Sequence, residues 1–151
     1  MTFAKDLAKV SWQDIHSFNN SILRQLKADN VKIDSILGIA RGGMIPATML
    51  SYQLESPYLD MLGVRTRDVD GTQFYGNPNM FGNVLVVDDI NDSGKTFNEV
   101  EKYLNYHFDR GEINNITFCA CIKRYGTIFE RGYYGAEFEG ESWYVFPWDK
   151  D

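Results

Sequence analysis

The stretch that decides the fold is residues 84–96, which read Val84-Leu85-Val86-Val87-Asp88-Asp89-Ile90-Asn91-Asp92-Ser93-Gly94-Lys95-Thr96. It opens with four apolar residues, three of them β-branched, which predict a strand buried on both faces, as in parallel sheets. Two adjacent carboxylates then end this predicted strand. A short polar turn follows and a helical pattern begins at once, so the stretch predicts a strand, a turn and a helix.

The polar turn has the composition of an anion-binding site. Gly94 lets the backbone turn tightly, so that N–H groups and the hydroxyls of Ser93 and Thr96 can converge at the start of the helix. Asp88 and Asp89 directly precede it. A phosphate site beside two carboxylates suits a sugar phosphate, whereas the alternative is an ordinary strand-to-helix turn with acidic caps.

The rest of the chain alternates between helical and strand patterns. A capping box at Ser11 and Asp14 predicts a first helix that runs to about Ala28. Further strands are predicted at 35–40, 58–64, 115–122, 132–138 and 142–146, and further helices at 44–54 and 96–108. This order predicts an α/β fold with a mainly parallel sheet covered on both faces, and ligands bind such sheets beyond the carboxyl ends of the strands.

Composition limits the class of protein. The chain has 151 residues, 44% hydrophobic and 24% charged, which is typical of a globular protein, so we predict a single domain over residues 1–151. No apolar run is long enough to span a membrane and Met1 to Val10 lack a signal-peptide core, so we expect a cytosolic protein. The net charge of −6 argues against nucleic acid as a partner.

The cysteines and histidines do not form a metal motif. Cys119 and Cys121 lie two apart in an apolar run, where they would share one face of a strand, and we interpret them as buried thiols. His16 and His107 are distant in sequence and are expected on helix surfaces. A zinc site would need further ligands.

The stretch 84–96 resembles the phosphoribosyl-pyrophosphate (PRPP) binding motif of type I phosphoribosyltransferases, an apolar strand followed by Asp-Asp-x-x-Asp-Thr-Gly-x-Thr. Ser93 stands where that motif usually has Thr, which keeps the hydroxyl. The resemblance implies a three-layer fold, with a central mainly parallel sheet, helices on both faces, a flexible active-site loop and a small C-terminal hood. It also implies that Asp88 and Asp89 bind the ribose hydroxyls, partly through Mg²⁺. The residues implied for the 5′-phosphate are Asp92, Ser93, Gly94, Lys95 and Thr96.

Two further segments resemble bacterial xanthine-guanine (hypoxanthine-guanine) phosphoribosyltransferases. Residues 41–47, Arg-Gly-Gly-Met-Ile-Pro-Ala, are similar to their Arg-Gly-Gly-Leu-Val-Pro-Gly run, which implies that Arg41, Gly42 and Gly43 hold pyrophosphate. Near the C-terminus these enzymes have a Trp, three variable residues and Pro-Trp-Asp, as do residues 143–149. This implies that Trp143 stacks on the purine, that Tyr144 contacts the base edge through its backbone, and that Asp149 lies near the purine 2-substituent or a metal.

The resemblance also assigns the polar contacts of the base. Lys123 matches a lysine that hydrogen-bonds a purine 6-oxo group, although Arg124 beside it leaves the match open by one position. Asp92 matches a carboxylate near purine N7 that accepts or shuttles a proton, and the alternative is an Asx turn. Arg65 to Gly82, a long polar stretch, matches the loop that closes over the site.

The resemblance therefore implies a purine phosphoribosyltransferase of purine salvage. It would convert PRPP and guanine, xanthine or hypoxanthine into the nucleoside 5′-monophosphate and pyrophosphate with Mg²⁺, the metal being held by Asp89 and Asp149. We expect a homo-oligomer, a dimer or a tetramer. The alternatives are PRPP-dependent transfer to another base and a non-catalytic nucleotide or PRPP sensor. A P-loop hydrolase is excluded because position 89 is Asp where that motif needs Gly.

Overall fold

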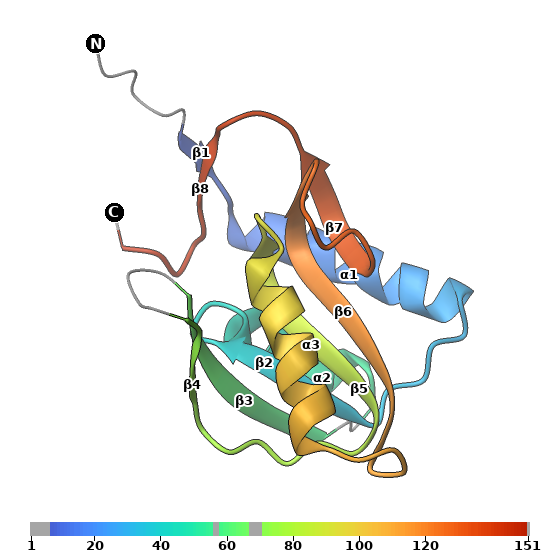
Figure 1. Cartoon of the computed structure of the whole chain (residues 1–151). Helices are drawn as coiled ribbons and strands as arrows, with labels where there is room; N and C mark the ends of the chain where they lie inside the picture. Colours follow the sequence, from blue (N-terminus) through green and yellow to red (C-terminus); the bar gives the residue numbers. More distant parts are fainter. Residues whose placement is uncertain (1–6, 56–57, 67–70, 151) are drawn as a thin grey trace.

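The computed structural model describes residues 7–55, 58–66 and 71–150 (Figure 1). The helices are α1 (Trp12–Ala28), α2 (Met44–Gln53) and α3 (Lys95–His107). The strands are β1 (Leu7–Lys9), β2 (Ser35–Ala40), β3 (Tyr58–Arg65), β4 (Gln73–Tyr75), β5 (Gly82–Asn91), β6 (Ile113–Arg124), β7 (Tyr133–Phe138) and β8 (Trp143–Val145). None of the helices in this part of the chain is long and apolar enough to cross a membrane.

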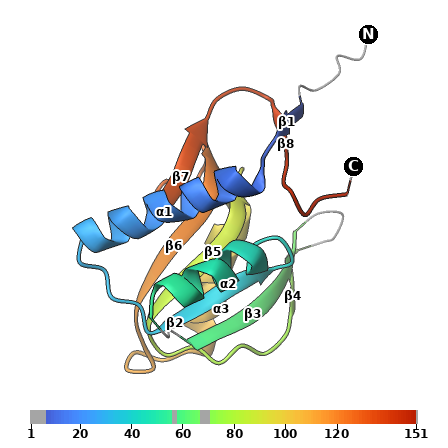
Figure 2. The ribbon, with the colours of Figure 1, turned by 180° about the vertical axis from the view of Figure 1, so that it is seen from behind.

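The central sheet has the strand order β4-β3-β2-β5-β6-β7. All neighbouring strands are parallel except β3 and β4, which are antiparallel. Helices α1 and α2 cover one face of the sheet and α3 covers the other (Figures 1 and 2). The predicted three-layer α/β fold with a mainly parallel sheet is confirmed.

Strand β5 lies in the middle of the core, as its sequence predicts. Its four residues from Val84 to Val87 are fully buried. Val84 and Val86 pack in the cluster that contains the buried residues of α3, and Leu85 and Val87 pack in the cluster under α1 and α2. This alternation follows from the two-residue period of a strand and explains why both kinds of position are apolar.

The helix boundaries follow local signals. Ser11 accepts a hydrogen bond from the Asp14 amide while the Asp14 side chain accepts one from the Ser11 amide, so the predicted capping box is present. The thiols of Cys119 and Cys121 are free and buried, and both histidines are exposed, as predicted.

Three features differ from the sequence predictions. Strand β5 runs to Asn91, so Asp88 and Asp89 lie within the strand instead of after it. The predicted loop from Arg65 to Gly82 contains β4, which pairs with β3, while its residues 67–70 lie outside the described ranges. Strand β1 was not predicted.

Strands β1 and β8 form a small separate sheet. They are parallel, with Leu7 opposite Trp143 and Lys9 opposite Val145. They lie side by side in both views (Figures 1 and 2). Together with residues 146–150 they form what we call the hood, which packs on the main sheet through a third apolar cluster of Val10, Ile15, Cys121, Ile122, Phe138 and Phe146. The single-domain boundaries, the homo-oligomer and the cytosolic location stay predictions.

Candidate functional site

The loop after β2 and the end of β5 meet at the carboxyl edge of the sheet. A Cβ atom on Gly42 would lie 2.1 Å from Asp89 Oδ2, and one on Gly43 would lie 2.5 Å from the Val87 carbonyl oxygen. A side chain at Gly43 would displace the backbone of β5, and one at Gly42 would displace the Asp89 carboxyl, so glycine allows the closest approach at both positions. The predicted glycine pair therefore lies directly against the predicted carboxylates.

A polar cavity of about 280 Å³ opens beside residues 92–96, which we call the phosphate turn. Gly94 has a φ of 91° and is the N-cap of α3, and Ser93 Oγ accepts a hydrogen bond from the Lys95 amide at 3.2 Å. A turn of this kind aims backbone N–H groups and the positive end of the helix dipole at one point. The lining residues include Thr66, Asp88, Asp92, Ser93, Gly94 and Thr96.

A second cavity of about 380 Å³ lies between the end of β5 and the hood. It brings together most of the residues predicted to bind the base. Its polar and aromatic lining consists of Asp89, Asp92, Arg124, Ser142, Trp143, Tyr144, Phe146, Asp149 and Lys150. Only Asp92 contributes a carboxylate to both cavities among the described residues, so the two cavities meet at this side chain.

The adjacent carboxyls of Asp88 and Asp89 face different cavities, because successive residues of a strand point to opposite sides. Burial, followed by the charge of Asp89, raises the pKa of Asp88 well above its usual value. Burial also raises the pKa of Asp89, and the charge of Asp149 adds to this effect. Burial therefore disfavours the ionised form of both carboxyls, and a cationic ligand or a hydrogen-bond donor would favour it.

The described residues can offer a metal ion only part of a coordination shell. They contain no group of three or more His, Cys, Asp and Glu side chains placed to hold a metal. Asp89 and Asp149 line the same cavity, and Asp149 Oδ2 accepts a hydrogen bond from the Phe146 amide at 2.8 Å. Two hard carboxylate ligands fit Mg²⁺, which usually takes its remaining ligands from water and substrate phosphates.

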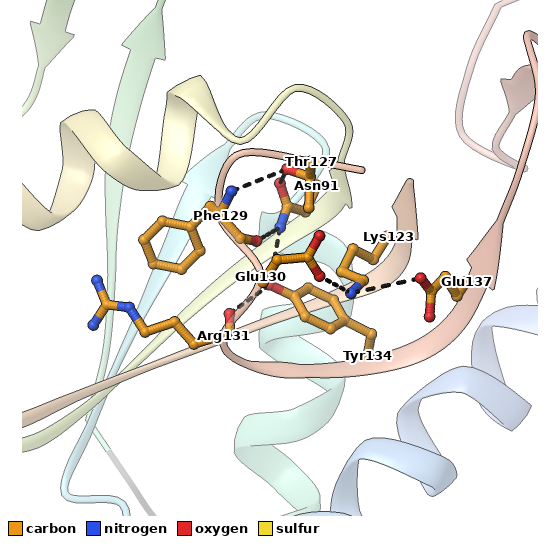
Figure 3. Close-up of polar contacts among 8 residues, drawn as sticks. All are labelled: Asn91, Lys123, Thr127, Phe129, Glu130, Arg131, Tyr134 and Glu137. Carbon is orange, nitrogen blue, oxygen red and sulfur yellow. Dashed lines mark hydrogen bonds and ion pairs between the residues drawn. The ribbon is translucent and has the colours of Figure 1, made fainter. Parts of the chain in front are cut away.

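Lys123 does not line either cavity, although the sequence resemblance assigns it to the base. It is 8% exposed, and its Nζ lies 2.6 Å from Glu130 and 3.7 Å from Glu137 (Figure 3). The hydrogen bond that Lys123 donates to Glu130 raises the pKa of Lys123. The neighbouring Arg124 lines the hood cavity instead, where it pairs with Asp92 and donates to the Gly140 carbonyl. Lys123 and Arg124 are successive residues of β6, so their side chains point to opposite sides of the sheet.

Two other predicted cationic residues are also absent from the linings of the two cavities. Arg41 and Lys95 are exposed, and neither lines the two cavities. Trp148, which the prediction left without a role, stacks on Phe146 with ring centroids 5.0 Å apart. Its indole N–H is buried without a hydrogen-bond partner in the described part of the chain.

The chain is similar to known proteins over most of its length. It is 26% identical to a xanthine-guanine phosphoribosyltransferase of Cereibacter sphaeroides, over 93% of this chain and 85% of that protein. Among solved structures, a purine phosphoribosyltransferase from Pyrococcus horikoshii has a TM-score of 0.81 at 25% identity, covering 97% of this chain and 95% of that one. A hypothetical protein from Neisseria gonorrhoeae, solved with bound ppGpp, has a TM-score of 0.78 at 25% identity, covering 99% and 92%.

The family comparison covers the whole site. The model of the phosphoribosyl transferase domain matches residues 11–149, which include the glycine loop, the phosphate turn and the hood strand β8. The carboxylate pair at the end of β5, the glycine-led start of α3 and the parallel sheet all lie within this match. The chain therefore belongs to the phosphoribosyl transferase domain family.

Proposed function

We propose that this protein is a purine phosphoribosyltransferase, which transfers the 5-phosphoribosyl group of PRPP to guanine, xanthine or hypoxanthine. The observation that carries the proposal is the position of Asp92, which lines both the polar cavity at the phosphate turn and the aromatic cavity under the hood. Such a reaction needs a carboxylate between a sugar-phosphate site and a base site. The names of the relatives from Cereibacter and Pyrococcus support this choice of substrate class.

Each cavity takes one part of the proposed substrates. The 5′-phosphate binds the backbone amides and hydroxyls of Ser93 and Thr96 at the start of α3, and Asp88 accepts hydrogen bonds from the ribose. Gly42 and Gly43 let the backbone approach the pyrophosphate. Those three assignments place the sugar at the carboxyl edge of β5.

The base binds under the hood. Trp143 stacks on the purine ring, and Tyr144 offers its backbone to the base edge. The guanidinium of Arg124 can donate to a 6-oxo group from the same cavity, where adenine would present a donor instead of an acceptor. Lys123 remains an alternative for this contact, provided that it leaves Glu130 and Glu137.

In the proposed reaction, purine N9 forms a bond to C1′ of the ribose while the bond from C1′ to the pyrophosphate oxygen breaks. The electron pair of that bond leaves with pyrophosphate, and the proton lost by the base passes to the Asp92 carboxylate. The protein contributes mainly by orienting the two reactants and excluding water. The products are the nucleoside 5′-monophosphate and pyrophosphate.

The proposal includes Mg²⁺, which would be held by Asp89 and Asp149. A bound Mg²⁺ would offset negative charge on the diphosphate. The carboxylates of Asp89 and Asp149 would themselves be ligands of that ion. Burial raises the pKa of Asp89, and a cation that enters the site would counter this effect by favouring the ionised carboxylate.

The test is pyrophosphate release from PRPP and Mg²⁺, measured with guanine, xanthine, hypoxanthine, adenine, uracil and orotate in separate reactions. Turnover with 6-oxopurines only is the expected result. Turnover restricted to adenine or a pyrimidine would contradict the roles given to Arg124 and Trp143.

A second candidate is nucleotide binding without turnover. It is favoured by the Neisseria protein, whose structure contains bound ppGpp. Calorimetry with GMP, PRPP and ppGpp separates the two functions. Tight nucleotide binding with no pyrophosphate release from any base would support a sensor.

A further inference from the structure

We infer that Asn91, Thr127 and Tyr134 form a positioning network that fixes the phosphate turn by tying it to the β6–β7 loop. This inference rests on the proposed function of the turn as the 5′-phosphate site. Thr127 and Tyr134 do not line the polar cavity, whereas Asn91 does, with its side-chain amide hydrogen-bonded to the loop and to Tyr134. All three are positioning residues in this inference. They act through the backbone of the turn.

Asn91 is the last residue of β5 and directly precedes the phosphate turn. Its side chain is inside the molecule, with the whole residue 3% exposed. The amide nitrogen donates to the Phe129 carbonyl at 2.8 Å and to the Tyr134 hydroxyl at 2.9 Å, while the amide oxygen accepts from Thr127 Oγ1 at 3.0 Å (Figure 3). Both amide protons and the oxygen are thus satisfied, as a buried amide requires.

The partners of Asn91 all belong to, or hold, the loop that joins β6 to β7. Thr127 Oγ1 also accepts from the Phe129 amide at 3.3 Å, and the Tyr134 hydroxyl donates to the Arg131 carbonyl at 2.7 Å (Figure 3). Burial raises the pKa of Tyr134 to about 12, so the hydroxyl keeps its proton at neutral pH. One amide therefore fixes the loop at several points along its length.

The same loop contacts the phosphate turn directly. The Ile128 amide donates to the Ser93 carbonyl at 3.0 Å. A Cβ atom on Gly94 would lie 2.6 Å from both the Phe129 nitrogen and Thr127 Oγ1. The loop thus packs directly against the turn without lining the open cavity, so a displacement of the loop would move Ser93 and Gly94.

A phosphate site made of backbone amides is sensitive to such displacement. Its N–H groups must converge on one anion, and misalignment lowers the strength of each hydrogen bond. A turn that is already held in its binding conformation also loses less conformational entropy when the ligand binds. Loss of one hydrogen bond in the network should therefore weaken phosphate binding by about threefold to tenfold.

The test compares two neighbouring tyrosines of β7. Tyr134→Phe removes only the hydroxyl, which accepts a hydrogen bond from Asn91 and donates one to the Arg131 carbonyl. Tyr133→Phe is the matched control, because the Tyr133 hydroxyl donates to Asp29 at 2.6 Å, remote from the turn. Ribose 5-phosphate binding is measured by calorimetry, and KM for PRPP and for guanine by pyrophosphate release.

We expect Tyr134→Phe to weaken ribose 5-phosphate binding and raise KM for PRPP by about threefold to tenfold, with kcat and KM for guanine within about twofold of wild type. Tyr133→Phe should leave ribose 5-phosphate binding, kcat and both KM values unchanged. A role confined to stability would lower the active fraction and hence kcat, without changing KM for one substrate.

A second pair of variants keeps the inference testable at another position. Thr127→Val removes the hydroxyl at nearly constant volume and should reproduce the effect, whereas Thr127→Ser keeps the hydroxyl and should restore binding. Wild-type affinity in both Tyr134→Phe and Thr127→Val would overturn the inference, as would equal weakening in Tyr133→Phe or in Thr127→Ser.

The inference and the proposed function fail in different ways. Wild-type protein that binds no ribose 5-phosphate overturns the inference. Protein that binds ribose 5-phosphate but releases no pyrophosphate from PRPP overturns the proposed reaction alone, and the variants then test the network by binding.

Discussion

The phosphate turn and the hood line the two adjoining cavities of the candidate site, but they are held in different ways. The turn continues a strand that is buried on both faces, and the hydrogen bonds of Asn91 tie the end of that strand to the β6–β7 loop. The hood is a two-stranded sheet joined to the rest of the molecule by one apolar cluster. The phosphate turn is thus continuous with the core of the protein, whereas the hood packs on the core as a separate small sheet.

This difference indicates that the turn and the hood bind different parts of the substrates. A phosphate has one shape and one charge, so a rigid site can be arranged for it in advance. Bases differ in their exocyclic groups, and an aromatic surface on a separate small sheet can accept several of them. Changes in the turn should therefore affect PRPP, and changes in the hood should affect the base.

The largest effect is expected at Asp92, where the two regions meet. Asp92→Asn should lower kcat by about 10²–10⁴-fold, because the amide cannot accept the proton of the base. Single-turnover nucleotide formation measures this step. Glu141→Gln is the matched control, since Glu141 lies with Arg124 and Asp92 along a neighbouring cavity and has no proposed role in proton transfer.

The next largest effect tests whether Arg124 or Lys123 contacts the 6-oxo group of the base. Arg124→Leu should raise KM for guanine by about tenfold or more, because a charge-assisted hydrogen bond is lost. Lys123→Leu should change KM for guanine by less than about twofold. The reverse result would assign the 6-oxo contact to Lys123 and would require its release from Glu130.

A smaller effect is expected at the aromatic wall of the hood. Trp143→Ala should raise KM for guanine by about fivefold to tenfold through lost stacking, with KM for PRPP unchanged. Steady-state kinetics with each substrate varied in turn measures the two values. Tyr106→Ala, on an 85% exposed residue of α3, is the control for removal of an exposed ring. An equal rise in KM for guanine and in KM for PRPP would contradict the claim that the hood acts on the base alone.

The smallest effect concerns stability on the turn side. The folded-state pKa of Asp88 is raised above its ordinary value of 3.8, so the folded protein retains a proton that the unfolded chain releases. The free energy of unfolding therefore falls as pH rises from about 4 through the folded-state pKa. Asp88→Asn removes this loss and should raise the melting temperature at pH 7, by about 2–4 °C for each kcal/mol gained.

Thermal unfolding at pH 5 and pH 8, without divalent cations or ligand, measures the Asp88 effect. The variant should exceed wild type by more at pH 8 than at pH 5. Asp109→Asn, at an exposed carboxyl, is the control. A variant less stable than wild type at both pH values would mean that the buried carboxyl stabilises the fold.

The strand, turn and helix around residues 84–96 could be predicted because their signals are local. Apolar β-branched residues, a glycine and an amphipathic helix follow one another without a gap, and Ser11 with Asp14 gave the start of α1 in the same way. The glycine loop after β2 was also predictable, since parallel strands bring their carboxyl ends to one edge.

The features that could not be predicted depend on distant partners. Asp88 and Asn91 remain in β5 because they pair with Ala120 and Lys123 of β6, although their polarity locally predicts the end of a strand. Strand β1 is three residues long and exists only through its pairing with β8. The side to which Lys123 points depends on the register of β6.

The pairing of β1 with β8 has a consequence for how the molecule forms. It joins segments from opposite ends of the described chain, and such contacts carry the greatest loop-closure entropy and are made late in folding. The main sheet and the phosphate turn can form without it. The base cavity is therefore completed last, and in the native protein the amides of β8 should be the first of this site to exchange with solvent.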